Sequence, residues 1–313
     1  MLSRVAENLY WFSRYLRRAE NLARLVNVGS QLQLDLPRSV RFAWRPLVET
    51  LGAVAEFDRL HADAEQAPDE AAVIRFLLLE PDNPQSLHEV VRQARELLRS
   101  VRETLPQDCW VAINDLYLYI EASTERAGSR RYRQDFLDRV IDSCLRVSAL
   151  LTTNVSRDIG FQFLRLGTAI EQVDMTSRII DTAAAGLIQP RSTEDLEAFR
   201  EMQWMSVLQC LAAYQMYRRH LRQRVSAELA LQFLLKDRQF PRSVLFCLTR
   251  IQGILPQMPA RRAVQLALNR ALGSVFDADP VRLLQLGPGI FMDRLQMELD
   301  ALDGALRQSY FQG

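Results

Sequence analysis

The residues with the clearest chemical potential form two similar clusters of charge. Each cluster lies on a segment with helical spacing, and each holds carboxylates next to guanidinium groups. The candidate residues are Arg14, Arg18, Glu20 and Arg24 in the first cluster, and Glu171, Asp174 and Arg178 in the second. Glu20 and Asp174 each precede an arginine by four positions, which is the favourable order for an ion pair on a helix.

Two interpretations of these clusters remain open. The charges can pair with one another and fix the register of the helices that carry them. Alternatively, Arg14 and Arg18, which share one helical face, can present guanidinium forks to the carboxylate of a ligand or partner. Arg157, Asp158 and Arg165 could extend the same network, although a helix cap is the favoured role for Asp158.

A different hypothesis makes the chain an enzyme. Glu171 and Asp174 would then act as paired carboxylates in acid–base or metal chemistry on a helical scaffold. A carboxylate–metal site in a helix bundle usually includes Glu-x-x-His motifs, and the sequence has none. His61 and Glu65 have a spacing that can hold a metal, but no second pair supports them, and His88 and His220 are isolated. We therefore predict no metal site and no cofactor.

The surrounding sequence predicts the elements that position these residues. Apolar residues recur with helical spacing over residues 3–34, and again from Tyr132 to Gly186 with interruptions near Asn154 and Gly160. A helix after Pro37 is expected to bend at Pro46. Alternating β-branched runs and hairpin turns are missing, so we predict an all-α, multi-helix bundle without strands.

The two clusters also lie in related segments. When Arg17 is aligned with Glu171, apolar and charged residues match over about a dozen positions, and Pro37–Val40 is repeated at Pro241–Val244. This pattern predicts an internal duplication. We expect one helical domain over residues 1–313 that contains two diverged pseudo-repeats, residues 1–128 and 129–313.

Composition limits the class of protein. The 313 residues are 48% apolar and 25% charged, and 39 basic residues oppose 38 acidic ones. The resulting net charge of +1 argues against general nucleic-acid binding. There is no signal-peptide pattern and no apolar run of about 18 residues, so we expect a cytoplasmic protein without a membrane span. Motifs for nucleophilic serine or phosphate binding are missing as well.

Several blocks of the sequence resemble those of the bacterial alpha-E proteins, which are helical proteins named for a recurrent Glu-Arg motif. The blocks cover nearly the whole chain. They are Met1–Trp11, Arg14–Leu16, Arg18–Asn21, Arg157-Asp158, Phe163–Gly167, Phe240–Val244 and Phe246–Leu248. The signature itself differs, because Arg17-Arg18 and Glu171-Gln172 stand at the two places where the family pattern has Glu-Arg.

The resemblance implies partners and leaves the chemistry open. Alpha-E proteins are typically encoded beside, or fused to, ATP-grasp ligases with permuted sequences and transglutaminase-like peptidases. Such systems are thought to make or modify peptides through amide bonds. The resemblance therefore suggests a non-catalytic accessory protein that works with an ATP-grasp amidoligase, and it transfers no catalytic residue. A homo-oligomer is compatible with the sequence.

Overall fold

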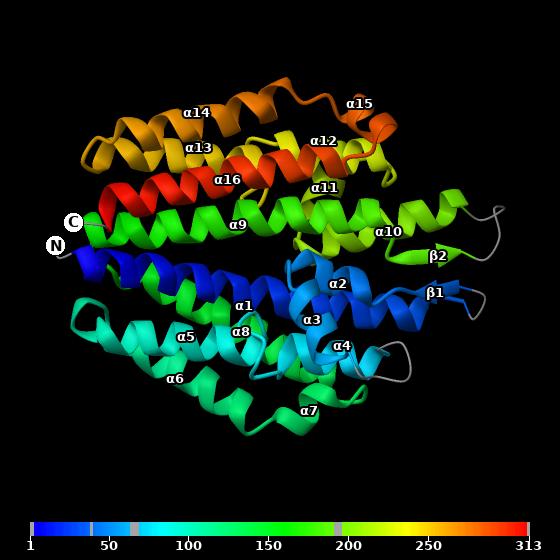
Figure 1. Cartoon of the computed structure of the whole chain (residues 1–313), viewed down its shortest axis with the longest axis horizontal. Coiled ribbons are helices and arrows are strands. Elements are labelled where there is room, and N and C mark those ends of the chain that lie inside the picture. The colour runs from blue at the N-terminus through cyan, green and yellow to red at the C-terminus, as the bar shows by residue number, and fades with distance from the viewer. Residues whose placement is uncertain (1–2, 38–39, 63–68, 191–195, 312–313) are drawn as a thin grey trace. The chain divides into compact units, whose positions relative to one another are not determined.

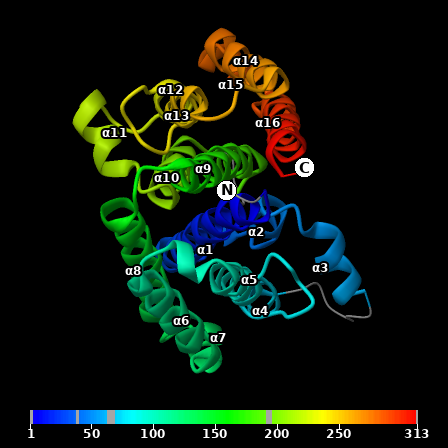
Figure 2. The same cartoon turned by 90° about the vertical axis from the view of Figure 1, so that its left-hand side faces the viewer.

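The computed structural model describes residues 3–37, 40–62, 69–190 and 196–311. These residues form sixteen α-helices, two short 3-10 helices and two strands of three residues each. The predicted all-α class is confirmed. Figure 1 shows the course of the helices, and Figure 2 shows many of them end-on.

The chain divides into two compact units. Unit 1 comprises Met1–Gln31 and Trp44–Gly167, and unit 2 comprises Leu32–Ala43 and Thr168–Gly313. The boundaries fall inside two long helices, α1 (Ser3–Asp35) and α9 (Ile159–Ala185). The division into pseudo-repeats 1–128 and 129–313 stays a prediction, as does their origin by duplication.

In unit 1, a series of helices follows most of α1. Its members are α2 (Arg45–Thr50), α3 (Val54–Leu60), α4 (Glu70–Leu78), α5 (Leu87–Ser100), η1 (Arg102–Thr104), α6 (Gln107–Glu121), α7 (Thr124–Gly128) and α8 (Arg133–Asn154). Helix α5 packs on α6, and α6 packs on α8 (Figures 1 and 2). Leu77, Leu98 and Phe136 are fully buried in this unit. Burial of each such side chain contributes about 1.5–3 kcal/mol.

Unit 2 contains most of α9 and the helices of the C-terminal third. These are α10 (Leu196–Cys210), α11 (Tyr214–Leu221), α12 (Ala227–Lys236), α13 (Val244–Ile254), η2 (Leu255–Gln257), α14 (Arg262–Asp277), α15 (Pro280–Leu286) and α16 (Gly289–Tyr310). Helices α14 and α16 pack side by side (Figure 2), and α13 packs on α14. Leu234, Val244 and Leu268 are fully buried here.

The expectation that the chain has no strand is wrong at one place in unit 2. Strand β1 (Val40–Phe42) pairs antiparallel with β2 (Ile188–Pro190), and Val40 lies opposite Pro190. Ala43 extends the pairing by donating its backbone N–H to the Leu187 carbonyl at 2.9 Å. The partner strands are far apart in the sequence, so no local pattern announces them.

Local rules explain where several helices begin. Asp69 accepts a hydrogen bond from the Ala72 N–H at 3.0 Å and thereby caps α4. The predicted bend at Pro46 is wrong, because Pro46 lies in the first turn of α2, where proline costs no hydrogen bond. Asn83 precedes α5 but does not cap it. Ser86 caps α5, and Asn83 instead accepts from the Gln85 N–H in a turn.

Candidate functional site

Glu20 is the centre of the first charge cluster, on α1 in unit 1. Its side chain is only 1% exposed and accepts hydrogen bonds from Arg17 and from Arg24, whose Nε lies 3.0 Å away. The predicted ion pair with Arg24 therefore forms, and Arg17 adds a second guanidinium. The charge of this buried carboxylate is compensated by two arginines, which fits a role in holding the helix surface together.

Arg14 and Arg18 lie against aromatic rings of the same helix. The Arg14 guanidinium carbon is 4.8 Å from the centre of the Trp11 ring, and that of Arg18 is 5.7 Å from the Tyr15 ring. Arg18 also donates to Gln85 Oε1 at 2.8 Å. Arg14 is buried, whereas Trp11, Tyr15 and Arg18 are half-buried. Arg14 and Arg18 thus form an arginine–aromatic ladder with Trp11 and Tyr15, in which the rings orient the guanidinium groups. The presentation of both guanidinium groups to a ligand carboxylate stays a prediction.

The three additional candidates gather around the start of α9 in unit 1. Asp158 accepts from the Phe161 N–H at 3.0 Å, so it caps the helix as the favoured interpretation expected. The Arg157 guanidinium carbon lies 4.0 Å from the centre of the Phe161 ring, and Arg165 lies on the same ring at 6.0 Å. Burial, together with repulsion from Arg157, lowers the pKa of Arg165.

The second charge cluster lies further along α9, in unit 2. Arg178 donates from Nε to both carboxylate oxygens of Asp174, at 3.0 Å each. The second predicted ion pair therefore forms as well. Glu171, one helical turn before Asp174, is fully buried. Asp174 is thus engaged by its own arginine, and Glu171 is the more sequestered of the two carboxylates.

Gln172 links this part of α9 to the segment before α13. Its side-chain amide donates to Thr176 Oγ1 at 3.2 Å, and Thr176 donates in turn to the Arg242 carbonyl at 2.9 Å. Arg17 and Arg18 belong to unit 1, whereas Glu171 and Gln172 belong to unit 2. The interpretation that charges of the two clusters pair with one another and fix the register of their helices stays a prediction.

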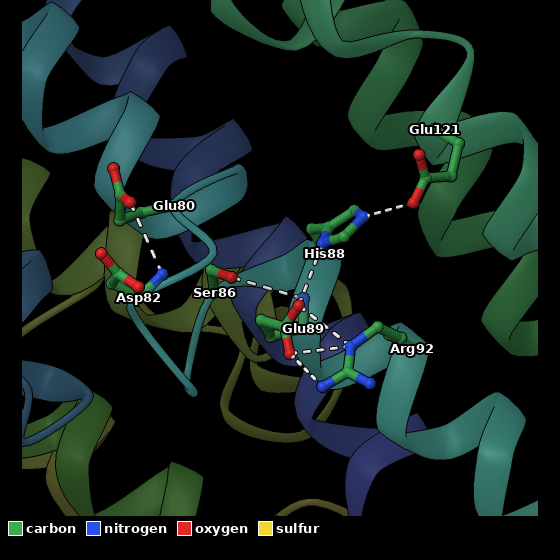
Figure 3. Close-up of polar contacts among 7 residues, drawn as sticks. All are labelled: Glu80, Asp82, Ser86, His88, Glu89, Arg92 and Glu121. Carbon is green, nitrogen blue, oxygen red and sulfur yellow. Dashed lines mark hydrogen bonds and ion pairs between the residues drawn. The ribbon is translucent and has the colours of Figure 1, made fainter.

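His88 was interpreted as isolated, and the structure corrects this. Figure 3 shows His88 on α5 pointing toward Glu121 on α6, and its Nε2 lies 2.6 Å from Glu121 Oε1. Hydrogen bonds from His88 and from Tyr117 hold the pKa of Glu121 below its usual range. Glu89 binds Arg92 through both of its oxygens. This polar network joins α5 to α6. His88 and Glu121 are 33 positions apart in the sequence, so no local sequence pattern indicates their contact.

A second unforeseen ion pair lies inside unit 1. Arg133 is 3% exposed and donates from Nη1 to Glu70 Oε1 at 2.9 Å, while Arg130 binds the other oxygen of Glu70. Burial alone would raise the pKa of Glu70, but the hydrogen bonds from Arg130 and Arg133 outweigh it and the pKa is lowered. These contacts tie the first turn of α4 to the start of α8.

The remaining candidates have ordinary surroundings. His61 Nδ1 lies 2.8 Å from the Phe57 carbonyl, and its proposed companion Glu65 lies outside the described residues. In the ranges that the structure describes, no three His, Cys, Asp or Glu side chains are grouped as metal ligands would be. The four cysteines are buried free thiols. No helix in these ranges has the length and apolar character needed to cross a membrane.

Comparison with known proteins gives one family. A family model described as Alpha-E, a predicted alpha-helical domain with a conserved ER motif, matches residues 1–311. Uncharacterized proteins of Mycobacterium bovis and Mycobacterium tuberculosis are 24% identical to the chain over 274 residues. That match covers 82% of this chain but 30% of each relative, so the chain spans less than a third of their length. No solved structure matches the chain.

Proposed function

The chain belongs to the Alpha-E family, and from this premise we propose that it is an accessory protein that binds an ATP-grasp amidoligase. In this role it is non-catalytic and shapes or covers the active site of the ligase in a system that synthesises or modifies peptides. A transglutaminase-like peptidase is a second partner of the same system. Cytoplasm is the compartment where ATP, the ligase and this chain would meet.

The length of the mycobacterial relatives is the observation that carries this proposal. In those proteins the matched region is about 30% of a much longer polypeptide. A helical unit of this type therefore works beside other covalently attached segments in its relatives. Such attachment favours a function that depends on contact with a neighbouring protein or domain.

The arginine–aromatic ladder on α1 supplies chemistry suited to such a contact. Trp11, Tyr15 and Arg18 are half-buried, and tryptophan, tyrosine and arginine are the residue types that contribute most to binding at protein interfaces. Arg18 is held by the Tyr15 ring and by Gln85, so little side-chain entropy would be lost when a partner carboxylate binds it.

The test is co-purification of the chain with an ATP-grasp ligase from the same genome. We expect wild-type protein to retain the ligase, and Arg18→Glu to weaken the complex at least tenfold, because like charges at an interface are costly. Arg102→Glu is the matched control, since Arg102 lies in the same unit and its side chain is 64% exposed. Equal affinity of the wild-type, Arg18→Glu and Arg102→Glu proteins would remove the ladder from the interface. Failure of the wild-type chain to bind the ligase would refute the proposal itself.

Burial of Glu171 favours one alternative, a helical enzyme that uses Glu171 and Asp174 in acid–base or metal chemistry. A carboxylate removed from water can hold or release a proton near neutral pH. Metal analysis of the purified protein tests the metal version, and loss of a stoichiometric divalent ion in Glu171→Gln would support it. A protein that purifies with no bound ion, and retains ligase binding in Glu171→Gln, would favour the accessory role.

A further inference from the structure

Unit 2 contains an open pocket that no motif in the sequence marks. It lies between α10, α11 and the segment that joins α11 to α12, and its volume is about 620 Å³. Its principal lining residues are Glu201, Met205, Tyr214, Arg218, Arg222 and Arg224. Ligand pockets in proteins commonly have volumes of roughly 300–1,000 Å³, so the space is sufficient for a small molecule or a few residues of a peptide.

The pocket carries an excess of positive charge. Three arginines oppose one glutamate, and the side chains of Arg218, Arg222 and Arg224 are all exposed. In the parts of the chain that the structure describes, no carboxylate lies within 4.0 Å of these three guanidinium groups. Arg24, Arg133 and Arg178, by contrast, each pair with a carboxylate of the chain. The three pocket arginines therefore offer several N–H donors to a ligand.

The backbone holds these donors in a defined arrangement. Arg222 has a positive φ of 53°, in the left-handed region that a residue with a side chain rarely adopts. Its N–H donates to the Arg218 carbonyl at 3.1 Å, which ends α11. Tyr217, which is fully buried, donates from its hydroxyl to the Arg224 carbonyl at 2.9 Å. A strained conformation that is fixed on both sides is a feature often found at binding sites.

We propose that this arginine pocket binds an acidic peptide segment through its carboxylate groups. Guanidinium forks match carboxylates in bidentate geometry, and an excess of two positive charges suits a segment with two carboxylates. Glu201 can accept a hydrogen bond from a peptide N–H, a donor that inorganic phosphate does not have. Met205, Tyr214 and Val225 provide apolar contact for the rest of the peptide.

This inference extends the proposed function. It rests on the proposed function only for the origin of the acidic peptide. Amidoligases act on carboxylates, so an acidic peptide held here would be a substrate of the partner enzyme. Peptide binding can be measured on this chain alone. A failure of the partner proposal and a failure of this one are therefore distinguishable.

The experiment is fluorescence anisotropy of a labelled pentaglutamate peptide titrated with the full chain, compared with pentaglutamine of the same length. We expect saturable binding of pentaglutamate only. Arg222→Gly should weaken it about tenfold, as loss of a charge-assisted hydrogen bond predicts. The thermal midpoint should not fall, because glycine adopts positive φ without strain. This variant therefore removes the guanidinium group without threatening the fold.

Arg219→Gln is the matched control. Arg219 is exposed on α11, the helix that carries Arg218, but it does not line the pocket. We expect its affinity for pentaglutamate to stay within twofold of wild type. Equal binding of the two peptides would overturn the proposal. So would an equal loss of affinity in Arg219→Gln and Arg222→Gly, which would indicate diffuse charge attraction. Displacement of pentaglutamate by a lower concentration of inorganic phosphate would assign the pocket to phosphate ligands instead.

Discussion

Replacing Gly167 by alanine is expected to destabilise the protein. At a helical position without close neighbours, the same change from glycine to alanine stabilises a protein. Gly167 lies on α9 where the first part of this helix meets α1 within unit 1. A Cβ atom at this position would lie 2.2 Å from Ser13 Oγ and 2.2 Å from the Tyr10 carbonyl oxygen. Real Cβ atoms essentially never approach another heavy atom within 3.0 Å. The two helices must therefore move apart to accept the methyl group.

The magnitude follows from two opposing terms. Alanine in a helix interior is favoured over glycine by about 1 kcal/mol. Forcing an extra carbon into a packed site costs about 1–3 kcal/mol, and the upper end applies here because a backbone carbonyl cannot rotate away. We expect a net loss of about 2 kcal/mol in the free energy of unfolding, which lowers the thermal midpoint by about 4–8 °C.

Urea unfolding followed by circular dichroism measures this difference. Gly273→Ala is the matched control, because a Cβ at Gly273 in α14 meets nothing within 4 Å, and it should stabilise the protein by up to about 1 kcal/mol. Adding Ser13→Ala to Gly167→Ala removes only the hydroxyl contact, so stability should recover little. A Gly167→Ala protein at least as stable as wild type would refute the close approach of the two helices.

Three further predictions use the buried and polar groups of unit 1. Glu70→Gln should cost about 3–5 kcal/mol in urea unfolding, because it leaves the buried Arg133 without its carboxylate. The pKa values of Glu70 and Glu121 are lowered in the folded protein, so their stabilising contributions are present above about pH 4.3 and are lost below it. A thermal midpoint that stays constant from pH 7 to pH 3 would contradict this. Burial raises the pKa of Cys109 to about 11 and also raises that of Cys144, so both thiols should react with a disulfide reagent at pH 8 only after unfolding.

Features set by neighbours in the sequence were predictable. The ion pairs Glu20–Arg24 and Asp174–Arg178 depend only on the four-residue spacing of a helix, and both form. The interruption near Asn154 also appears, since α8 ends there and α9 begins at Ile159. These features require no knowledge of tertiary structure, because every partner lies within one helical turn.

Features set by distant residues were not predictable in this way. Strand β1 exists because Val40–Phe42 meets Ile188–Pro190, and neither segment alternates over enough residues to indicate a strand. The repeated tetrapeptide shows the same limit. In Pro241–Val244, Ser243 caps α13, whereas Val40 in the other copy begins a strand. Val40 and Val244 end the same tetrapeptide, yet Val40 begins a strand and Val244 begins a helix, because their tertiary neighbours differ.

The arginine pocket had a partial signal in the sequence. Residues 218–224 include four arginines and one histidine, a basic run that helical periodicity assigns only to the end of a helix. The positive φ of Arg222 has no sequence signature, since glycine or asparagine would normally mark such a position. The supporting hydrogen bond from Tyr217 likewise depends on a fold in which that ring is buried.

Arginine therefore has two roles in this chain, and helical spacing identifies the arginines that are paired locally. Arg24 and Arg178 each have an acidic residue four positions earlier, and each is paired with it. Arg218 and Arg222 have no acidic residue three or four positions away in either direction. An arginine that has no acidic residue three or four positions away is neutralised by solvent ions, by a distant segment of the chain or by a ligand. In a chain with net charge +1, such arginines are balanced by acids elsewhere, so overall charge conceals a site that local spacing reveals.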